Sequence, residues 1–587
     1  MSSRQKTQKK PKAAKEAEKQ ARQLPLSTIL KNVGRAAALL LIAGIASPVS
    51  QLSLSPVFGS IPASIHHQRT MTFTAVAALI GRRSVKSYVS ANVAEYVAVV
   101  AYWAPVIQFL LFPYSAKLGI EYGPLIIEAL TYYPLLFLSV YAAADLLDTF
   151  DLERFNLPSS LVEIVLPTAS YFTVSTVSKI SSALLPGLVG TSVYFTRVGF
   201  QMLLASASAF LTPSKLIVFA FPAILHSLWA NPHHPSDHAF QLANSTLVST
   251  QNFTILARQE SITGYISVLE NDADNAFRLL RCDHSLLGGE WLVTPEAYKK
   301  GQRQPESIFA VFVLLEAVRL IEPPVASDAT TAPAPPNDSQ KSALVIGLGI
   351  GTAPNALIAH GINTTIVELD PVVHHYASKY FSLIPDHTAV IDDAVTYVAE
   401  KSVTNPGSFN YIIHDVFTGG AEPVYLFTTE FMKGLYDLLQ DDGAVAINYA
   451  GDLSLGSTKL VLNTIHAVFP ACRLFRDTPA PQTLKPGEAD FINMVVFCVK
   501  NDHGKGKLAV QFREAERDDF LGSIARRNFL QPSEELEVKY QFVRPEDGGK
   551  VMGRADVGEL EKFHKEGAVS HWRIMRTVLP AGVWEMW

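Results

Sequence analysis

A succession of apolar segments in the first 230 residues restricts the fold of this chain more than any other feature. They cover residues 36–58, 70–81, 94–115, 124–145, 161–181, 190–212 and 214–230. A membrane-spanning helix needs about 20 mostly apolar residues, and most of these segments provide them. The segment 70–81 is short and ends in Arg82 and Arg83, which favours an interfacial or re-entrant position. We therefore predict a multi-pass transmembrane region over residues 36–232, with about seven helices and a range of six to eight.

A basic tail precedes the first apolar segment. Residues 1–35 contain ten Lys and Arg residues but only two acids, Glu16 and Glu18, so we predict a disordered tail. Positive charge next to the first span predicts a cytoplasmic N-terminus. An even number of spans would then keep the rest of the chain on the cytoplasmic side, and an odd number would place it across the membrane.

The composition after Pro232 changes to that of an α/β protein. Alternating apolar and polar residues predict a small β-sheet subdomain, and a helical pattern follows it. We predict four segments: residues 240–324 as the small sheet plus a helix, 325–341 as a linker rich in Ala and Pro, 342–500 as a larger α/β domain, and 501–587 as a C-terminal extension.

Charge and cysteine content exclude several classes of protein. The net charge of −5 does not suit a nucleic-acid partner, which would need a basic face. The three cysteines, Cys282, Cys472 and Cys498, lie far apart in sequence, so we predict neither a disulfide framework nor a metal site, and they suit a reducing compartment. The histidine-rich run at 233–238 has no second ligand cluster, so we interpret it as a linker and predict no metal.

A glycine-rich turn at residue 347 predicts a nucleotide site. The apolar run Ala343–Ile346 leads into Gly347-Leu348-Gly349-Ile350-Gly351, and a helical pattern follows. A second apolar run closes with Glu368-Leu369-Asp370, about 20 residues after the turn, where a carboxylate can bind ribose hydroxyls. Thr352 stands where a dinucleotide fingerprint has its third glycine, so the spacing favours S-adenosylmethionine. Candidate cofactor-binding residues here are Gly347, Gly349, Gly351, Glu368 and Asp370.

Acidic residues also follow the next two predicted strands. Asp392 and Asp393 end the run Thr388–Ile391, and Asp415 ends the run Tyr411–His414. An open parallel sheet binds its ligand beyond the carboxyl ends of its strands, so these acids join the candidate cofactor site. The predicted fold is thus an α-helical membrane bundle followed by a doubly wound α/β, Rossmann-like domain of the class I methyltransferase type, with a small N-terminal β-sheet subdomain.

Residues 253–500 resemble the spermidine/spermine synthase family of S-adenosylmethionine-dependent transferases. The stretches that carry the resemblance are Phe277–Asp283 with Leu287–Gly289, Val345–Gly351, Val367–Pro371, Ile391–Ala394, Tyr411–Asp415 and Gly420–Phe431. The resemblance implies S-adenosylmethionine or its decarboxylated form as cofactor. It also implies that Glu368 holds the ribose, Asp393 the adenine amino group, and Asp415 the sulfonium or amine region.

One departure from the family bears on the reaction. The family has a second acid in an Asp-x-x-Asp-Pro segment, whereas this chain has Thr418 after Asp415. Threonine cannot take a proton from an amine near neutral pH. We therefore predict a methyltransferase, with Asp415, Asn448 and Tyr449 as candidate catalytic residues. The alternatives are a polyamine aminopropyltransferase and a non-catalytic nucleoside-binding regulator of the membrane region.

The sequence leaves the acceptor and the side of the membrane open. The expected partners are a small-molecule or membrane-proximal acceptor and the lipid bilayer, and a homodimer is left open. We expect a multi-pass endomembrane protein. Because S-adenosylmethionine is made in the cytosol, a cytosolic transferase domain is favoured. Four glycosylation sequons, at Asn244, Asn252, Asn337 and Asn363, point to the other side.

Overall fold

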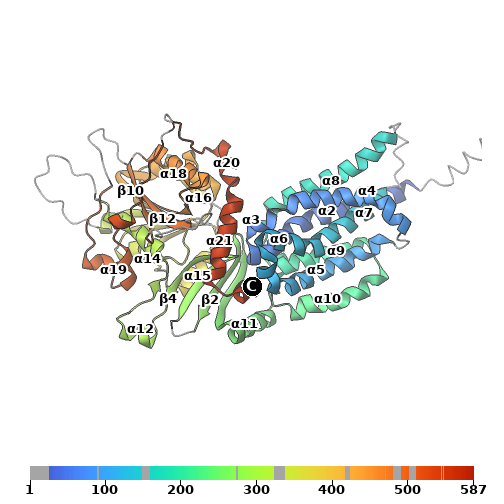
Figure 1. Ribbon diagram of the computed structural model, residues 1–587, viewed down its shortest axis with the longest axis horizontal. Helices are drawn as coiled ribbons and strands as arrows, with labels where there is room; N and C mark the ends of the chain where they lie inside the picture. Colours follow the sequence, from blue (N-terminus) through green and yellow to red (C-terminus); the bar gives the residue numbers. More distant parts are fainter. Residues whose placement is uncertain are drawn as a thin grey trace, which may run out of the picture.

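The computed structural model shows two parts that lie side by side, a helical region and an α/β region (Figure 1). The described residues are 25–88, 92–147, 159–272, 275–322, 338–416, 423–469, 471–479, 491–500, 510–543, 545 and 548–587. The basic tail up to residue 24, most of the linker (323–337), Thr418 and residues 420–422 of the family-like segment lie outside them.

The first part of the described chain is a bundle of helices. Its elements are α2 (Leu26–Phe58), α3 (Ser60–Ser64), α4 (His67–Tyr88), α5 (Val97–Leu111), α6 (Ser115–Leu130), α7 (Tyr132–Leu147), α8 (Ser159–Leu184), α9 (Arg197–Leu211) and α10 (Phe221–Leu225), the last flanked by helical turns over 215–230. Within the described residues two helical stretches, Leu26–Phe58 and Val93–Leu130, are long and apolar enough to cross a membrane, a test that some soluble and signal helices also pass. The segment expected to be short, 70–81, lies inside the 22-residue helix α4.

Helix α2 joins the two ends of this bundle. Phe58, at its C-terminal end, lines a cavity shared with the α/β region. Arg35 lies 23 residues earlier in the same helix, about 35 Å away at 1.5 Å per residue, and donates to the carbonyl of Leu211 at the end of α9. The end marked by Arg35 is therefore distant from the α/β region, and the end marked by Phe58 is adjacent to it.

The other helices can be ordered between the same two ends. Near the distant end, Ser214 donates to Glu95 and Arg82 lies 3.6 Å from Asp145. At the adjacent end, Ser115 donates to Glu585 of the C-terminal extension, and Phe109 packs on His226. In the described residues the chain thus traverses the bundle seven times, through α2, α4, α5, α6 with α7, α8, α9 and the 215–230 segment.

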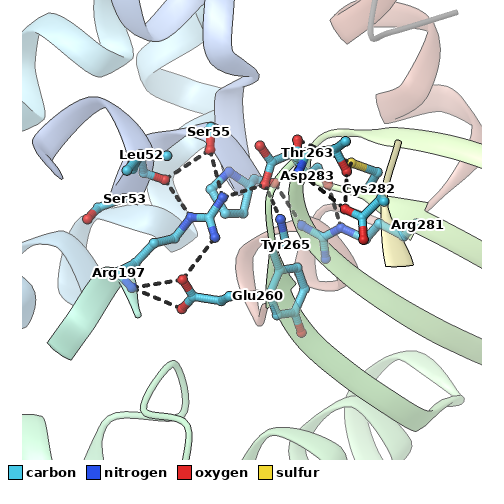
Figure 2. A network of polar contacts seen from close by, with 12 residues as sticks. Leu52, Ser53, Ser55, Arg197, Glu260, Thr263, Tyr265, Arg281, Cys282 and Asp283 are labelled. Carbon is cyan, nitrogen blue, oxygen red and sulfur yellow. Dashed lines mark hydrogen bonds and ion pairs between the residues drawn. The ribbon is translucent and has the colours of Figure 1, made fainter. Parts of the chain in front are cut away.

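Buried arginines join the helical region to the small sheet. Arg197, at the start of α9, donates to Glu260 and Asp283 and also to the carbonyl of Leu52 (Figure 2). Arg281 donates to the carbonyls of Pro56 and Trp584. Burying these charges is costly, but each guanidinium is hydrogen-bonded, so removing one partner would leave a buried unpaired charge.

The small sheet has five antiparallel strands in sequential order. They are β1 (Phe253–Ser261), β2 (Gly264–Asn271), β3 (Phe277–Cys282), β4 (Ser285–Trp291) and β5 (Glu306–Ser307). Helix α11 (Asp237–Gln251) and the C-terminal helices α21 (His564–Val578) and α22 (Ala581–Glu585) pack against it, with Leu247, Leu279 and Trp584 in the shared core. The sheet is therefore held between the bundle and the larger domain.

The larger domain is a seven-stranded sheet in the order β11-β12-β10-β9-β6-β7-β8. Its strands are β6 (Ser342–Ile346), β7 (Asn363–Glu368), β8 (Thr388–Ile391), β9 (Phe409–His414), β10 (Leu439–Asp452), β11 (Ala471–Arg476) and β12 (Phe491–Val499). The first five are parallel, and β12 runs antiparallel to both neighbours. The strand order reverses between β6 and β9, and such a switch point opens a crevice at the carboxyl ends of the strands.

Helices cover both faces of this sheet because its strand residues alternate between two cores. Ala343 and Val345 point to the core that contains α14 (Thr352–Ala359) and α15 (Pro371–Tyr380). Leu344 and Ile346 point to the core that contains α16 (Ala394–Thr404), α17 (Thr429–Leu438) and α18 (Gly456–Val468).

The prediction that the three cysteines form no disulfide was wrong for one pair. Cys472 in β11 and Cys498 in β12 occupy directly paired positions and form a disulfide. The sequence did not show this pairing, because the two residues are 26 positions apart and meet only through the antiparallel pairing of β11 with β12. Cys282 is free.

Candidate functional site

The glycine turn after β6 adopts a conformation that only glycine accommodates at two positions. Gly347 has φ +83°, and a Cβ there would lie 2.1 Å from the carbonyl oxygen of Asp415. Gly349 has φ +55°, and its Cβ would lie 2.4 Å from the carbonyl oxygen of Leu287 in β4. Gly351 has φ +87° and precedes α14. The turn is therefore pressed between the sheet edge and the small sheet, with its amides beside the cavity.

Glu368 ends β7 and faces this turn. Its carboxylate accepts the amide of Leu348 at 2.9 Å and the amide of Asp370 at 2.9 Å. The side chain is 8% exposed and lines the cavity. Burial raises the pKa of Glu368 to about 7, although the amides oppose the shift. A carboxylate held in this way can accept ribose hydroxyls.

Asp370 has a structural role in this fold. Its carboxylate caps α15 by accepting the amide of Val372, and it also accepts the hydroxyls of Ser261 and Thr263 from the small sheet. The side chain is fully buried and lies outside the residues that line the cavity. Asp370 therefore fastens the two sheets together, and the predicted role in cofactor binding has no geometry to support it.

The two acidic residues that follow β8, Asp392 and Asp393, make different hydrogen bonds. Asp393 caps α16, accepting the amides of Val395 and Thr396 with its two carboxylate oxygens. Asp392 accepts the amide of Asp393 with one oxygen. Both line the cavity. Asp392 is the better placed of the two for an adenine amino group, whereas the family resemblance implied Asp393.

Asp415 directly follows β9, and Asn448 lies beside it in β10, one residue after Ile447, which pairs with His414. Asn448 Nδ2 donates to Asp415 Oδ1 at 2.7 Å, and both residues line the cavity. Burial raises the pKa of Asp415 to about 6, and the Asn448 hydrogen bond only partly offsets this. Asn448 is 5% exposed, and its Oδ1 has no hydrogen-bond partner among the described residues. The pair thus presents an oxygen acceptor next to a carboxylate.

Tyr449 lies on the opposite face of β10 from Asn448. Successive side chains of a strand alternate, so Asn448 and Ala450 line the cavity while Tyr449 packs edge-on against Phe427 in the core. The structure does not bring Tyr449 to the site with the other predicted residues.

The cavity measures about 640 Å³ and extends well beyond the predicted residues. One wall is the carboxyl edge of the seven-stranded sheet, and a second is the β3–β4 hairpin of the small sheet. Further walls include residues 58–62 of the helical region, helix α21 of the C-terminal extension and the segment with Phe309, Val311 and Phe312. Sequence reasoning missed these walls, because no local pattern marks a contact between segments about 500 residues apart.

These residues fit S-adenosylmethionine. Gly347, Leu348 and Gly349 of the turn line the cavity, so this segment lies where a ligand would bind. Among the described residues, Glu368 has no salt-bridge partner for its desolvated carboxylate, and Asn448 Oδ1 has no hydrogen-bond partner. Hydroxyl and amine groups of a bound nucleoside and its acceptor would satisfy both.

Comparisons with known proteins show which families this chain resembles. The spermine/spermidine synthase domain family matches residues 325–476, which confirms that resemblance. The N-terminal histidine N-methyltransferase of Emericella nidulans is 43% identical over 565 residues, covering 94% of this chain and 97% of that protein. A polyamine aminopropyltransferase of Vibrio vulnificus is 33% identical over 116 residues, covering 19% of this chain and 38% of that protein.

Among solved structures, a probable spermidine synthase from Corynebacterium glutamicum aligns with a TM-score of 0.32 and 16% identity, covering 49% of this chain and 95% of that one. The E. nidulans similarity spans both the helical region and the transferase domain, and it confirms methyl transfer over aminopropyl transfer. The chain belongs to the family of the E. nidulans N-terminal histidine N-methyltransferase and is an S-adenosylmethionine-dependent methyltransferase.

Proposed function

We propose that this enzyme methylates a nitrogen of an N-terminal histidine in a polypeptide acceptor. The observation that carries the proposal is the 43% identity to the E. nidulans enzyme along 94% of the chain. A match of this extent spans the end of the helical region that lines the cavity as well as the glycine turn and Glu368. At least one wall on the acceptor side of the cavity is therefore inside the shared region, together with the cofactor side.

The residues at the cavity suit transfer to nitrogen. Glu368 and the glycine turn would hold the nucleoside, with Asp392 at the adenine. When bound, S-adenosylmethionine supplies a methyl group on a sulfonium, and its transfer to nitrogen needs a free lone pair and releases one proton overall. Asp415 is placed to take that proton, and Asn448 Oδ1 to accept an N–H of the acceptor. A carboxyl pKa of about 6 is close to that of imidazole, which suits proton exchange between them.

A peptide assay tests the proposal. The full-length protein in detergent is incubated with S-adenosylmethionine and a synthetic peptide that begins with histidine. We expect the peptide to gain one methyl group, located on residue 1 by fragmentation. Peptides that begin with alanine and carry an internal histidine are the controls. Methylation of the controls at the same rate, or of no peptide at all, would refute the proposed acceptor.

We also propose that the helical region crosses a membrane seven times and that the transferase domain lies opposite the basic tail. The seven traverses begin at the distant end and finish at the α/β region. Large apolar side chains such as Phe73, Ile80 and Phe210 are more than 70% exposed on the bundle, which suits contact with lipid. The Cys472–Cys498 disulfide suits an oxidising compartment. These features favour the non-cytosolic side, against the expectation drawn from where the cofactor is made.

A further inference from the structure

The helical region supplies part of the cavity in which the methyl group is transferred. Phe58, Ile61 and Pro62, at the adjacent end of the bundle, line the same cavity as Gly347, Glu368 and Asp415. The cofactor-holding residues are all on the sheet edge, so this second wall remains for the acceptor.

Helix α21 and the end of α2 form one continuous wall. Trp572 Nε1 donates to the carbonyl of Val57 at 3.1 Å, and Arg576 donates to the same carbonyl at 3.2 Å. Arg576 also donates to Ser115 and pairs with Glu585 at 3.1 Å. Because these bonds cross between the C-terminal extension and the bundle, the wall keeps its shape only when both are present.

His284 lies on this side of the cavity and has one buried polar atom without a partner among the described residues. The ring is 3% exposed, stacks on Trp584 with centroids 4.3 Å apart, and lines the cavity. Arg576 Nε donates to His284 Nε2 at 3.1 Å, so Nε2 carries the lone pair. Burial and the charge of Arg576 hold the pKa of His284 well below its usual value, so the ring is neutral and its proton is on Nδ1. Nδ1 has no hydrogen-bond partner among the described residues.

We propose that the helical region is part of the acceptor-binding site, and that His284 Nδ1–H donates to an acceptor atom of the peptide's first residue. This inference rests on the proposed function, because it takes a peptide N-terminus as the ligand. The first peptide carbonyl and an unprotonated ring nitrogen of histidine are the acceptor atoms that such a ligand offers. Asn448 Oδ1, on the opposite wall, would receive an N–H of the same residue.

Two substitutions with matched controls test the inference on the full-length protein. His284→Phe keeps the stacked ring and removes both ring nitrogens, while Arg576 retains its bonds to Val57, Ser115 and Glu585. Its control is His375→Phe on the exposed surface of α15. Ile61→Trp narrows the cavity from the bundle side. Its control is Ile80→Trp, where the side chain is 74% exposed. Peptide affinity, KM and kcat are measured with the histidine peptide, and cofactor affinity by calorimetry with S-adenosylhomocysteine.

We expect His284→Phe to raise the Kd and KM for the peptide roughly tenfold, as loss of a hydrogen bond to a buried group implies. Ile61→Trp should raise KM at least as much. S-adenosylhomocysteine affinity should stay within about twofold in both, and the two controls should match the wild type. If the wild type methylates the peptide and both variants bind it with unchanged affinity, this inference is refuted and the proposed function stands. If the wild type binds the cofactor but does not methylate the peptide, the proposed function is refuted instead.

Discussion

Glu368 is the residue whose loss should weaken the cofactor site most directly. Glu368→Gln keeps the shape of the side chain but removes the charge that accepts two amides and the expected ribose hydroxyls. Because hydrogen bonds to a charged group contribute about 1.5–3 kcal/mol, we expect S-adenosylhomocysteine affinity to fall roughly 10- to 100-fold in calorimetry. Glu400→Gln is the control, since Glu400 is 65% exposed on α16. Equal affinity in the two variants would contradict the assignment.

The pKa of Asp415 predicts how the rate depends on pH. A raised pKa of about 6 means that the carboxylate is lost as the pH falls through 6, rather than near 4. We expect kcat for the histidine peptide to fall on the acid side of that value. In Asp415→Asn kcat should drop about 100-fold. The imidazole of the acceptor has a pKa in the same range and also affects the rate. The contribution of Asp415 is therefore the part of the acid limb of the pH–rate profile that differs between the wild type and Asp415→Asn. If the wild type and Asp415→Asn had identical pH–rate profiles, Asp415 would not take part in proton transfer.

Single residues were predictable from the sequence only where local chain geometry decides their position. Glu368 is the last residue of β7 and Asn448 lies in β10 level with the end of β9, so the parallel strands bring both to one edge of the sheet. Asp370 also follows a strand, but its partners Ser261 and Thr263 belong to the small sheet, more than 100 residues away. Tyr449 is the next residue of the strand after Asn448, so its side chain points to the opposite face of the sheet. The sequence did not show which of the two faces lines the cavity.

At the scale of elements, the glycine turn is one of the contacts between the two sheets, alongside the Asp370 hydrogen bonds. Gly349→Ala places a Cβ 2.4 Å from the Leu287 carbonyl, in addition to the strain of φ +55°. Gly361 has φ +80° but no atom closer than 3.9 Å to its Cβ, so Gly361→Ala adds strain alone. We expect Gly361→Ala to cost about 1–2 kcal/mol of stability, seen as a lower Tm. Gly349→Ala should cost more and also abolish S-adenosylhomocysteine binding.

The control for this pair is the cofactor affinity of Gly361→Ala, which should remain near that of the wild type. Equal losses in both variants would mean that φ strain, and not the close approach of the turn to β4, limits position 349.

Elements with a strong local pattern were predicted well, and contacts between distant elements were not. The strand–turn–helix at 343–360 and the apolar segments of the first 230 residues correspond to β6, α14 and the helices of the bundle. Helix α21 has polar and apolar residues at helical spacing, but nothing in its sequence names the end of α2 as its neighbour. The wall formed by α21 and the end of α2 could therefore be found only in the folded chain.

At the scale of the whole molecule, the arrangement of the bundle makes a prediction about the side of the membrane. Seven traverses separate the basic N-terminal end from the α/β region. If the basic tail is cytoplasmic, the transferase domain and its Cys472–Cys498 disulfide lie on the other side. In sealed microsomes, we expect added protease to remove an N-terminal tag while the transferase domain stays intact. Detergent should abolish the protection.

The reactivity of the cysteines is a second test of the side of the membrane on which the transferase domain lies. On the oxidising side, a maleimide added to denatured, unreduced protein should modify only Cys282, and reduction should expose Cys472 and Cys498 as well. On the cytosolic side, all three thiols should react without reduction. Digestion of the transferase domain in intact microsomes, together with three reactive thiols, would contradict the proposed orientation. Protection of the domain with a single reactive thiol would mean that S-adenosylmethionine has to reach the site across the membrane.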